Sequence, residues 1–390
     1  MKILFLHQYF CPPDGYGNNR SLELAKYWVE QGHEVIMVTS SAHFPSNHPI
    51  HQKNYHFQWI EGIQVHILNV LYSHYFSFTK RIFAFLKFYF LANQFIKKLS
   101  KMDIIYASST PPSVGELGKN WSIKWKVPLI FETVDVWPDV PEQMGIIKNP
   151  IVLKYLHSKV EAIYHHASKI IALSPDMKKQ IVSHKVPEEK IWVSYNGTRT
   201  DFFKPLKKNY SIPKVIYAGT IGKVNDVSQF VYAAKALEKQ AEFMLIGNGN
   251  EASKIKKLIL KLKPQSLTWN TWIPKNEIAE KIASCDIGVS TIANFKVLEA
   301  NSANKFYDYL ACGLPVLNNY EGWQKEFLTK NQCGMGTELG KINQFIENLN
   351  FLIKNEDLRK KWSDNARNAA IKYFDRKKIA LDLLELLKNL

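Results

Sequence analysis

Short apolar runs alternate with amphipathic segments along the first half of the chain. Residues 2–10 have the composition of a buried strand, residues 21–31 repeat their apolar side chains at helical spacing and end before a glycine, and residues 33–39 are again apolar. This order predicts a β-α-β unit with parallel strands. Four further strands are expected at residues 104–107, 129–132, 170–173 and 191–195. The pattern therefore predicts a doubly wound α/β domain.

A second series of the same kind follows a polar linker at residues 206–213. Its predicted strands lie at residues 215–219, 243–246, 287–291 and 316–318. We therefore expect three parts: an α/β domain at 1–205, a second α/β domain at 206–372, and a helix at 373–390 that returns to the first domain. Two such domains joined by a hinge would leave a deep cleft at the carboxyl edges of their sheets.

The composition narrows the range of partners. The chain has 51 Lys and Arg residues against 35 Asp and Glu residues, which gives a formal charge of +16. Such a charge favours nucleic acid, an anionic membrane surface or phosphorylated substrates. The four cysteines are widely spaced without a C-x-x-C pair, which argues against a disulfide framework or a zinc site and fits a reducing cytoplasm. The first apolar run is too short for a signal peptide, and no run is long enough to span a bilayer.

A short helix predicted at residues 305–311 carries the first group with candidate chemistry. Asn304 and Lys305 lie at its beginning, and Asp308 follows one turn later. A helix N-terminus with an added cation favours an anion such as phosphate, and a carboxylate on the same face can accept hydrogen bonds from sugar hydroxyls. This combination suits a nucleotide sugar. An amphipathic helix with Phe306 and Leu310 buried and its charges in solvent explains the same residues equally well.

Loops after the strands of the first domain carry the remaining candidates. Gly15 and Gly17 would let backbone approach a ligand, but no third glycine completes a dinucleotide fingerprint and the second strand ends without an acid, which excludes an NAD site. Glu132 and Asp135 could serve as a base or as ligands for hydroxyl groups at the carboxyl edge of the sheet. Asp135 could equally cap the turn before Pro138.

Residues 72–101 are unusually aromatic and basic, with six Lys or Arg residues and no acid. One helical stripe is expected to face the core: Ile82, Phe85, Leu86, Tyr89, Ala92 and Ile96. Aromatic rings and cations together are typical of a helix that lies at a membrane surface. The predicted membrane contacts are Lys80, Arg81, Phe83, Lys87, Phe88 and Phe90. The alternative is a helix that is buried on both sides within the domain.

Several motifs recur in a characteristic order along the chain. They are Q-Y-F-x-P-P-D-G-x-G, A-S-S-x-P-P, F-E-x-x-D-x-W-P, L-S-P-x-M, N-G-x-x-x-x-x-F-x-P, Y-A-G-T-I-G, L-I-G-N-G and N-K-F-Y-D-Y-L-A-C-G-L-P-V. In this order and spacing the chain resembles the retaining glycosyltransferases of family 4, which have the GT-B fold of two Rossmann-like domains, and in particular their bacterial surface-polysaccharide branch.

The resemblance implies that the first domain, at 1–205, binds the acceptor and that the second domain, at 206–372, holds a sugar nucleotide. Asp308 would bind the ribose hydroxyls, and Asn304 and Lys305 would lie against the diphosphate. The other implied donor contacts are Gly15, Gly17, Gly219, Thr220, Gly222, Lys223, Gly247, Trp272 and Ile273. The family's first acid would fall at Ala300, whereas the nearest acid is Glu299. Two basic residues of many relatives are replaced here by Thr220 and Asn225, so Lys223 or Lys305 would supply that charge.

The resemblance and the inventory of residues together predict a metal-independent glycosyltransferase. The chain has no D-x-D motif to hold a metal-bound diphosphate, so leaving-group charge would be stabilised by Lys305 and helix amides. Asp135 is the candidate for acceptor positioning or proton removal, and Glu299 is a further catalytic candidate. No cofactor is expected beyond the UDP-sugar as co-substrate.

The predicted reaction moves a sugar, expected to be an N-acetylated amino sugar, with retention onto a polyprenyl-diphosphate-linked acceptor. The expected role is O-antigen, lipopolysaccharide or capsule synthesis by a cytoplasmic protein bound peripherally to the anionic inner face of the plasma membrane, without nucleic acid. Two alternatives remain open: a UDP-sugar 2-epimerase with the same fold, and a non-catalytic partner that binds a sugar nucleotide or membrane.

Overall fold

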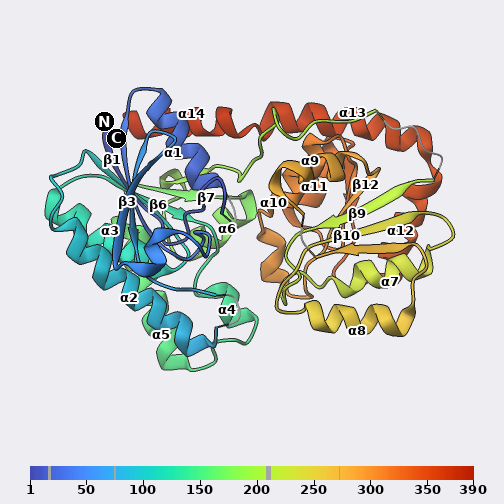
Figure 1. Cartoon of the computed structure of the whole chain (residues 1–390), viewed down its shortest axis with the longest axis horizontal. Coiled ribbons are helices and arrows are strands. Elements are labelled where there is room, and N and C mark those ends of the chain that lie inside the picture. Colours follow the sequence, from blue (N-terminus) through green and yellow to red (C-terminus); the bar gives the residue numbers. More distant parts are fainter. Residues whose placement is uncertain (16–18, 74–75, 208–211, 272) are drawn as a thin grey trace. The chain divides into compact units, whose positions relative to one another are not determined.

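The chain forms two α/β units, each built around its own sheet (Figure 1). The computed structural model describes residues 1–15, 19–73, 76–207, 212–271 and 273–390. Unit 1 comprises Met1–Tyr195 and Arg376–Leu390, and unit 2 comprises Asn196–Asp375. The first boundary lies before the one predicted after residue 205, and the second lies after the one predicted at residue 372. The prediction of two doubly wound α/β domains is confirmed.

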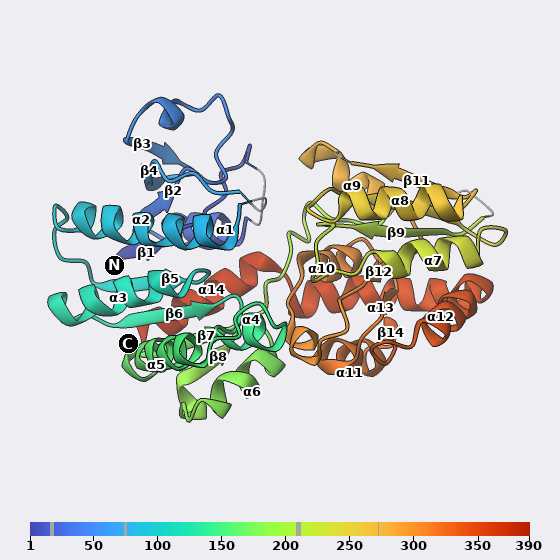
Figure 2. The ribbon, with the colours of Figure 1, turned by 90° about the horizontal axis from the view of Figure 1, so that it is seen from below.

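Unit 1 contains an eight-stranded sheet with the strand order β3-β4-β2-β1-β5-β6-β7-β8. All neighbours are parallel except the pair β3 and β4. The strands are β1 (Lys2–Leu6), β2 (Glu34–Ser40), β3 (Tyr55–Ile60), β4 (Ile63–Leu68), β5 (Ile104–Ser108), β6 (Leu129–Thr133), β7 (Lys169–Ala172) and β8 (Ile191–Val193). The helices are α1 (Arg20–Glu30), α2 (Phe78–Ile96), α3 (Pro112–Trp125), α4 (Asp139–Gln143), α5 (Pro150–His166), α6 (Pro175–Ser183) and α14 (Arg376–Lys388). Helices α1 and α14 cover one face of this sheet, and α2, α3 and α5 cover the other (Figures 1 and 2).

The antiparallel hairpin of β3 and β4 is an element that the apolar pattern did not predict. Its two-residue turn consists of Glu61 and Gly62, which both have positive φ angles, of 49° and 76°. Such a turn matches the twist of the flanking strands. β3 is therefore an edge strand, and its side chains Tyr55, Phe57 and Trp59 are exposed on one face.

Unit 2 contains a six-stranded parallel sheet with the order β11-β10-β9-β12-β13-β14. The strands are β9 (Lys214–Ala218), β10 (Glu242–Ile246), β11 (Leu267–Asn270), β12 (Ile287–Ser290), β13 (Val316–Asn318) and β14 (Gly334–Gly336). The helices are α7 (Ser228–Ala236), α8 (Ala252–Leu262), α9 (Lys275–Ala283), α10 (Asn304–Ala311), α11 (Gly322–Lys330), α12 (Ile342–Lys354) and α13 (Glu356–Tyr373). Helices α7, α8 and α12 lie on one face of the sheet, and α9, α10, α11 and α13 lie on the other (Figure 1).

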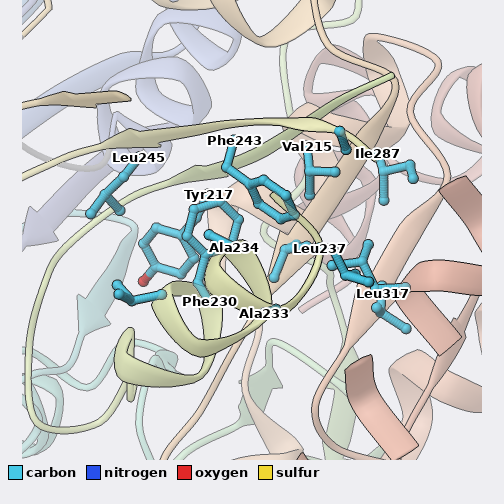
Figure 3. Packing of buried hydrophobic residues seen from close by; sticks show 14 of the residues in the cluster. Val215, Tyr217, Phe230, Ala233, Ala234, Leu237, Phe243, Leu245, Ile287 and Leu317 are labelled. Atoms are coloured by element: carbon cyan, nitrogen blue, oxygen red, sulfur yellow. The ribbon is translucent and has the colours of Figure 1, made fainter. Parts of the chain in front are cut away.

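Buried aromatic rings fill the space between the unit 2 sheet and α7. Tyr217 of β9, Phe243 of β10 and Phe230 of α7 meet in this layer (Figure 3). The ring centroids of Phe230 lie 6.0 Å from those of Tyr217 and 5.7 Å from those of Phe243. Edge-to-face aromatic pairs at such distances stabilise beyond the area that they bury. This layer supports the strand ends that carry the loops described below.

Helix α2 turns a different face to the core from the one that its sequence suggested. Its buried side chains include Ala84, Phe88, Ala92 and Ile96, which repeat every four residues. Phe88 is only 1% exposed, so its prediction as a membrane contact is wrong. The other predicted contacts fit better: Phe83 and Phe90 are 70% and 60% exposed. Lys80 and Lys87 are also exposed, and Arg81 is half-buried.

Two members of the stripe that was expected to face the core point outward instead. Ile82 and Leu86 are 40% and 49% exposed, beside Phe83 and Phe90. The outer face of α2 is consequently more apolar than predicted. Within the described part of the chain, no helix is both long enough and apolar enough to cross a bilayer.

Candidate functional site

A cavity of about 500 Å³ opens at the carboxyl ends of β9 and β10 in unit 2. Loops after these two strands form one wall, and the first turn of α10 forms another. The predicted donor residues that line it are Gly219, Thr220, Gly247, Ile273, Asn304, Lys305 and Asp308. The structure therefore brings together residues from four separate segments of the sequence, at the sheet edge where ligands bind in doubly wound folds.

Two glycines allow the loops of this cavity to come close together. The amide of Gly219 donates to the carbonyl of Ile246 over 2.9 Å. A Cβ atom at Gly247 would lie 1.9 Å from the carbonyl oxygen of Gly219, a contact that no side chain tolerates. A Cβ atom at Gly219 would lie 2.7 Å from Cε of Lys305. Glycine at both positions thus lets the lysine lie across the backbone at the end of β9.

Lys305 is the cation of this cavity. Its Nζ lies 4.9 Å from the ring centroid of Tyr217, and among the residues that the structure describes it has no carboxylate partner within ion-pair distance. Burial away from water disfavours the charged form and lowers the pKa of Lys305 to about 8. An ammonium group that is desolvated and has no counter-ion attracts an anion. The N-terminal amides of α10 add to that attraction.

The opposite side of α10 is held by a segment whose role the sequence did not reveal. Thr198 donates through Oγ1 to Oδ1 of Asp308 over 2.5 Å. Nδ2 of Asn196 donates to Oδ1 of Asn304 over 2.7 Å and to the carbonyl of Ser302 over 3.1 Å. Asn196 and Thr198 belong to the N-G-x-x-x-x-x-F-x-P motif, and they orient two side chains of the cavity.

Some of the predicted donor residues lie elsewhere. Glu299 lines a different cavity of unit 2, of about 890 Å³, where its Oε1 accepts from the amide of Glu321 over 3.3 Å. Lys223 is exposed and does not line the 500 Å³ cavity, and neither does Gly222. Lys305, and not Lys223, is therefore the lysine at this cavity. The predictions for Gly17 and Trp272 fall outside the described residues.

Two residues that the sequence singled out as departures from the family pattern do line the cavity. Thr220 and Asn225 are polar and uncharged, and Nδ2 of Asn225 donates to the carbonyl of Thr220 over 2.9 Å. They leave Lys305 as the one basic side chain among the lining residues that the structure describes. The remaining lining residues, which the sequence did not single out, include Thr271, Ile278 and Ile282.

Unit 1 has a cavity of about 290 Å³ at the carboxyl edge of its own sheet. Its floor contains a buried ion pair in which Nε of Arg20 lies 2.8 Å from Oε1 of Glu132. Glu132 also accepts from the hydroxyls of Tyr106, over 2.9 Å, and Ser108, over 2.7 Å. Burial would raise the pKa of Glu132, but the Arg20 charge and these hydrogen bonds outweigh it and lower the pKa. Glu132 therefore has a structural role, and it is a poor candidate for the base that removes the acceptor proton.

Asp135 also lines the unit 1 cavity and is less constrained. Its Oδ2 accepts from Oγ1 of Thr110 over 3.2 Å. The surrounding protein displaces water and raises the pKa of Asp135, while donation from Thr110 acts in the opposite direction. His7 lies in the same cavity, where burial lowers its pKa to about 4 and its Nδ1 is 2.8 Å from Oγ of Ser21. Asp135 is the side chain best suited to accept a proton or a hydroxyl hydrogen bond here.

Gly15 is required by close packing in unit 1. A Cβ atom there would lie 2.5 Å from the carbonyl oxygen of His43, another residue of the unit 1 cavity. Among the described residues, one group of side chains could hold a metal ion, and its members line neither cavity: Asp139, His157 and His184. The two cavities therefore offer an anion site in unit 2 and a carboxylate in unit 1.

Comparisons with known proteins match both units. Two family models follow one another along the chain: Glycosyltransferase Family 4 at residues 17–202 and Glycosyl transferases group 1 at residues 198–369. N-acetyl-alpha-D-glucosaminyl L-malate synthase of Bacillus anthracis is 22% identical over 386 residues, which cover 92% of this chain and 89% of the relative.

Two solved structures have the same fold over the full chain. Sucrose-phosphate synthase of Thermosynechococcus elongatus superposes with a TM-score of 0.79 at 14% identity and covers 100% of this chain and 98% of its own. The HepE protein of Anabaena, solved in complex with UDP-glucose, superposes with a TM-score of 0.72 at 17% identity and covers 100% of both chains.

Proposed function

Because this chain is a glycosyltransferase with the GT-B fold, built from a family 4 domain and a group 1 domain, we propose that it transfers a sugar from a UDP-sugar to an acceptor linked to polyprenyl diphosphate. The observation that carries the donor assignment is Lys305, a half-buried ammonium without a carboxylate partner among the described residues, in a 500 Å³ cavity at the start of a helix. A nucleoside diphosphate would supply the negative charge that pairs with this ammonium.

The donor would be held along the unit 2 cavity. Lys305 and the first amides of α10 would bind the diphosphate and stabilise the charge that develops on the leaving group. Asp308, held by Thr198, would accept from the ribose hydroxyls. The HepE complexes with UDP and UDP-glucose support a UDP-sugar, and the likeness to N-acetyl-alpha-D-glucosaminyl L-malate synthase supports an N-acetylated amino sugar.

The acceptor hydroxyl would be positioned by Asp135 in unit 1. Asp135 is exposed to solvent, and its raised pKa makes the carboxylate a better proton acceptor than an aspartate with the ordinary pKa. We propose transfer with retention and without a metal at the diphosphate, because Lys305 and helix amides provide the stabilising charge.

An exposed aromatic and basic surface in unit 1 supports a lipid-linked acceptor. Phe83 and Phe90 of α2 are largely exposed, next to the exposed cations Lys80 and Lys87. The exposed stripe of β3 lies on the same side of the sheet, because its Tyr55 stacks on Phe95 of α2 at 5.6 Å. Trp59 of this stripe is 62% exposed. Aromatic rings with flanking cations favour the headgroup region of an anionic bilayer. We infer peripheral binding at the cytoplasmic face of a bacterial inner membrane, in O-antigen or capsule synthesis.

Radiolabelled transfer tests this function directly. The protein is incubated with lipid-linked acceptors and a panel of UDP-sugars, and label is measured in the organic-extractable product. Transfer from at least one UDP-sugar, lost in Lys305→Met, is the expected result. Absence of transfer from every UDP- and GDP-sugar would overturn the proposal, and turnover of the UDP-sugar without acceptor would indicate an epimerase.

Co-sedimentation with liposomes tests the membrane surface separately. Replacement of Lys80, Arg81 and Lys87 by glutamine should weaken binding to anionic vesicles by about 1 kcal/mol per charge. Equal sedimentation of variant and wild type would contradict the membrane assignment and leave the donor assignment intact.

A further inference from the structure

Three helices of unit 1 bring one carboxylate and two imidazoles together. Asp139 is the first residue of α4, His157 lies within α5, and His184 directly follows the last residue of α6. One potential ligand atom of each lies within 4.8 Å of the other two. These residues are far apart in the sequence, and none of them lines the unit 1 cavity or the unit 2 cavity.

Each histidine of this group also has a carboxylate at one ring nitrogen. Nε2 of His157 lies 2.8 Å from Oε2 of Glu142, and Nδ1 of His184 lies 3.6 Å from Oε1 of Glu161. Nε2 of His184 faces Asp139, at 3.0 Å from its Oδ2. Histidines that bind metals usually donate their second ring N–H to a carboxylate, which fixes the tautomer and the orientation of the ring. Glu142 is placed for that role, and Glu161 lies just beyond hydrogen-bond distance.

The spacing of the group suits a small cation after a modest adjustment. In a tetrahedral zinc site with bonds of about 2.0–2.1 Å, neighbouring ligand atoms lie about 3.3 Å apart. The His184 and Asp139 atoms at 3.0 Å already have this separation. The remaining atoms, at no more than 4.8 Å, would have to approach by about 1.5 Å at most. The side chain of His157 is 27% exposed and has room to rotate.

Charge and burial favour a cation at this place. Asp139, Glu142 and Glu161 contribute three carboxylates around two imidazoles, in a chain whose formal charge is +16. The side chains of His184 and Asp139 are only 8% and 18% exposed. Partly buried carboxylates attract a divalent cation more strongly than exposed ones, because less water screens them.

We propose that Asp139, His157 and His184 bind a divalent transition metal, in first place zinc, with water in the fourth position, and that the bound metal ties α4 to α5 and α6. Two imidazoles and a carboxylate are a donor set that zinc takes in proteins. The short helix α4 begins just after the loop that carries Asp135. Occupancy of the site would hold this loop in place, without any part of the metal in the transfer reaction.

Metal titration of the untagged, chelator-treated full chain tests the proposal without an activity assay. Calorimetry with zinc should show one site per chain with a dissociation constant of about 1 μM or below, and cobalt(II) should give the visible absorption of a tetrahedral site. Zinc at 100 times its dissociation constant should raise the free energy of unfolding, seen as a higher melting temperature. Glu142→Gln should weaken zinc binding about 10- to 100-fold.

Matched histidine variants show where the metal binds. His157→Ala combined with His184→Ala should abolish the calorimetric signal, whereas His165→Ala, an exposed histidine on the same helix, should leave it unchanged. His157→Gln alone serves if the double variant does not fold. Absence of zinc binding to the wild type, or unchanged binding in His157→Gln, would overturn the site.

Discussion

The two cavities lie at equivalent edges of two similar sheets, but the basic side chain of one is paired with a carboxylate and that of the other is not. In unit 1, Arg20 is neutralised by Glu132 and also donates through Nη1 to the carbonyl of Tyr195 over 2.6 Å. In unit 2, Lys305 is half-buried and desolvated, and it has no carboxylate partner among the described residues. A completed ion pair holds the lining of its cavity rigid, whereas a cation without a carboxylate partner attracts an anionic ligand. Under the proposed function, the unit 1 cavity would take a neutral hydroxyl acceptor and the unit 2 cavity a diphosphate.

The largest expected effect comes from breaking the completed pair. Arg20→Met would leave Glu132 as a buried charge without its partner and should lower the free energy of unfolding by about 3–5 kcal/mol. Denaturant unfolding followed by circular dichroism measures this loss. Lys26→Met is the control, because Lys26 lies on the same helix and pairs with Glu61 over 2.7 Å at the surface, where a pair contributes about 0–1 kcal/mol.

A double variant separates the charge from the packing around Arg20. Arg20→Met with Glu132→Gln removes both charges and keeps an acceptor for Tyr106 and Ser108, so it should recover part of the lost stability. A double variant as unstable as the sum of the two single ones would mean that the pair is not coupled.

The second effect falls on ligand binding instead of stability. Lys305→Met should weaken UDP binding by about 1.5–3 kcal/mol, the range for a charge-assisted contact, and should leave the free energy of unfolding unchanged or raised. Calorimetry with UDP and thermal unfolding of the same variant measure both quantities. The exposed Lys223→Met is the control and should bind UDP as the wild type does. Wild-type UDP affinity in Lys305→Met would refute the contrast between the two cavities.

Much of the unit 2 cavity could be predicted from the sequence, because its position follows from the topology of a parallel sheet. Parallel strands bring their carboxyl ends to one edge, so Gly219, Gly247 and the first turn of α10 had to lie close together. The contact between Thr198 and Asp308 could not be predicted, because it joins two segments more than a hundred residues apart through one hydroxyl. Glu299 looked like a displaced family acid, yet the turn before α10 directs it into another cavity.

The prediction for Phe88 failed for a different physical reason. Aromatic residues occupy nearly every face of α2, so periodicity does not show which face is buried. Packing against α3 decides it, as Tyr89 and Asn93 of α2 accept hydrogen bonds from Asn120 and Trp121. The three possible metal ligands were missed because they follow no short motif and meet only through the packing of α4, α5 and α6.

The pH dependence of UDP binding sharpens the comparison further. The pKa of Lys305 without ligand is lowered by burial to about 8, and a bound diphosphate stabilises its charged form. Below pH 8 the lysine is already protonated and affinity should be flat. Above pH 8 binding has to take up a proton, so affinity should fall by up to about tenfold, or 1.4 kcal/mol, per pH unit. Calorimetry in buffers of different ionisation enthalpy at pH 9 should detect this uptake, and Lys305→Met should show none.

The smallest expected effect concerns the hydrogen bond from Thr198 that holds Asp308 at the unit 2 cavity. Thr198→Val keeps the shape of the side chain but removes its hydrogen bond to Asp308, and it should weaken UDP binding by about 0.5–1.5 kcal/mol. If Asp308 binds the ribose, the loss should disappear with 2′,3′-dideoxy-UDP, whereas the loss in Lys305→Met should persist with that ligand. Thr200→Val is the control, because Thr200 lies in the same segment and donates to Asp375 instead of Asp308. Equal losses with both ligands would show that Thr198 stabilises the segment in general and does not position the carboxylate for the sugar.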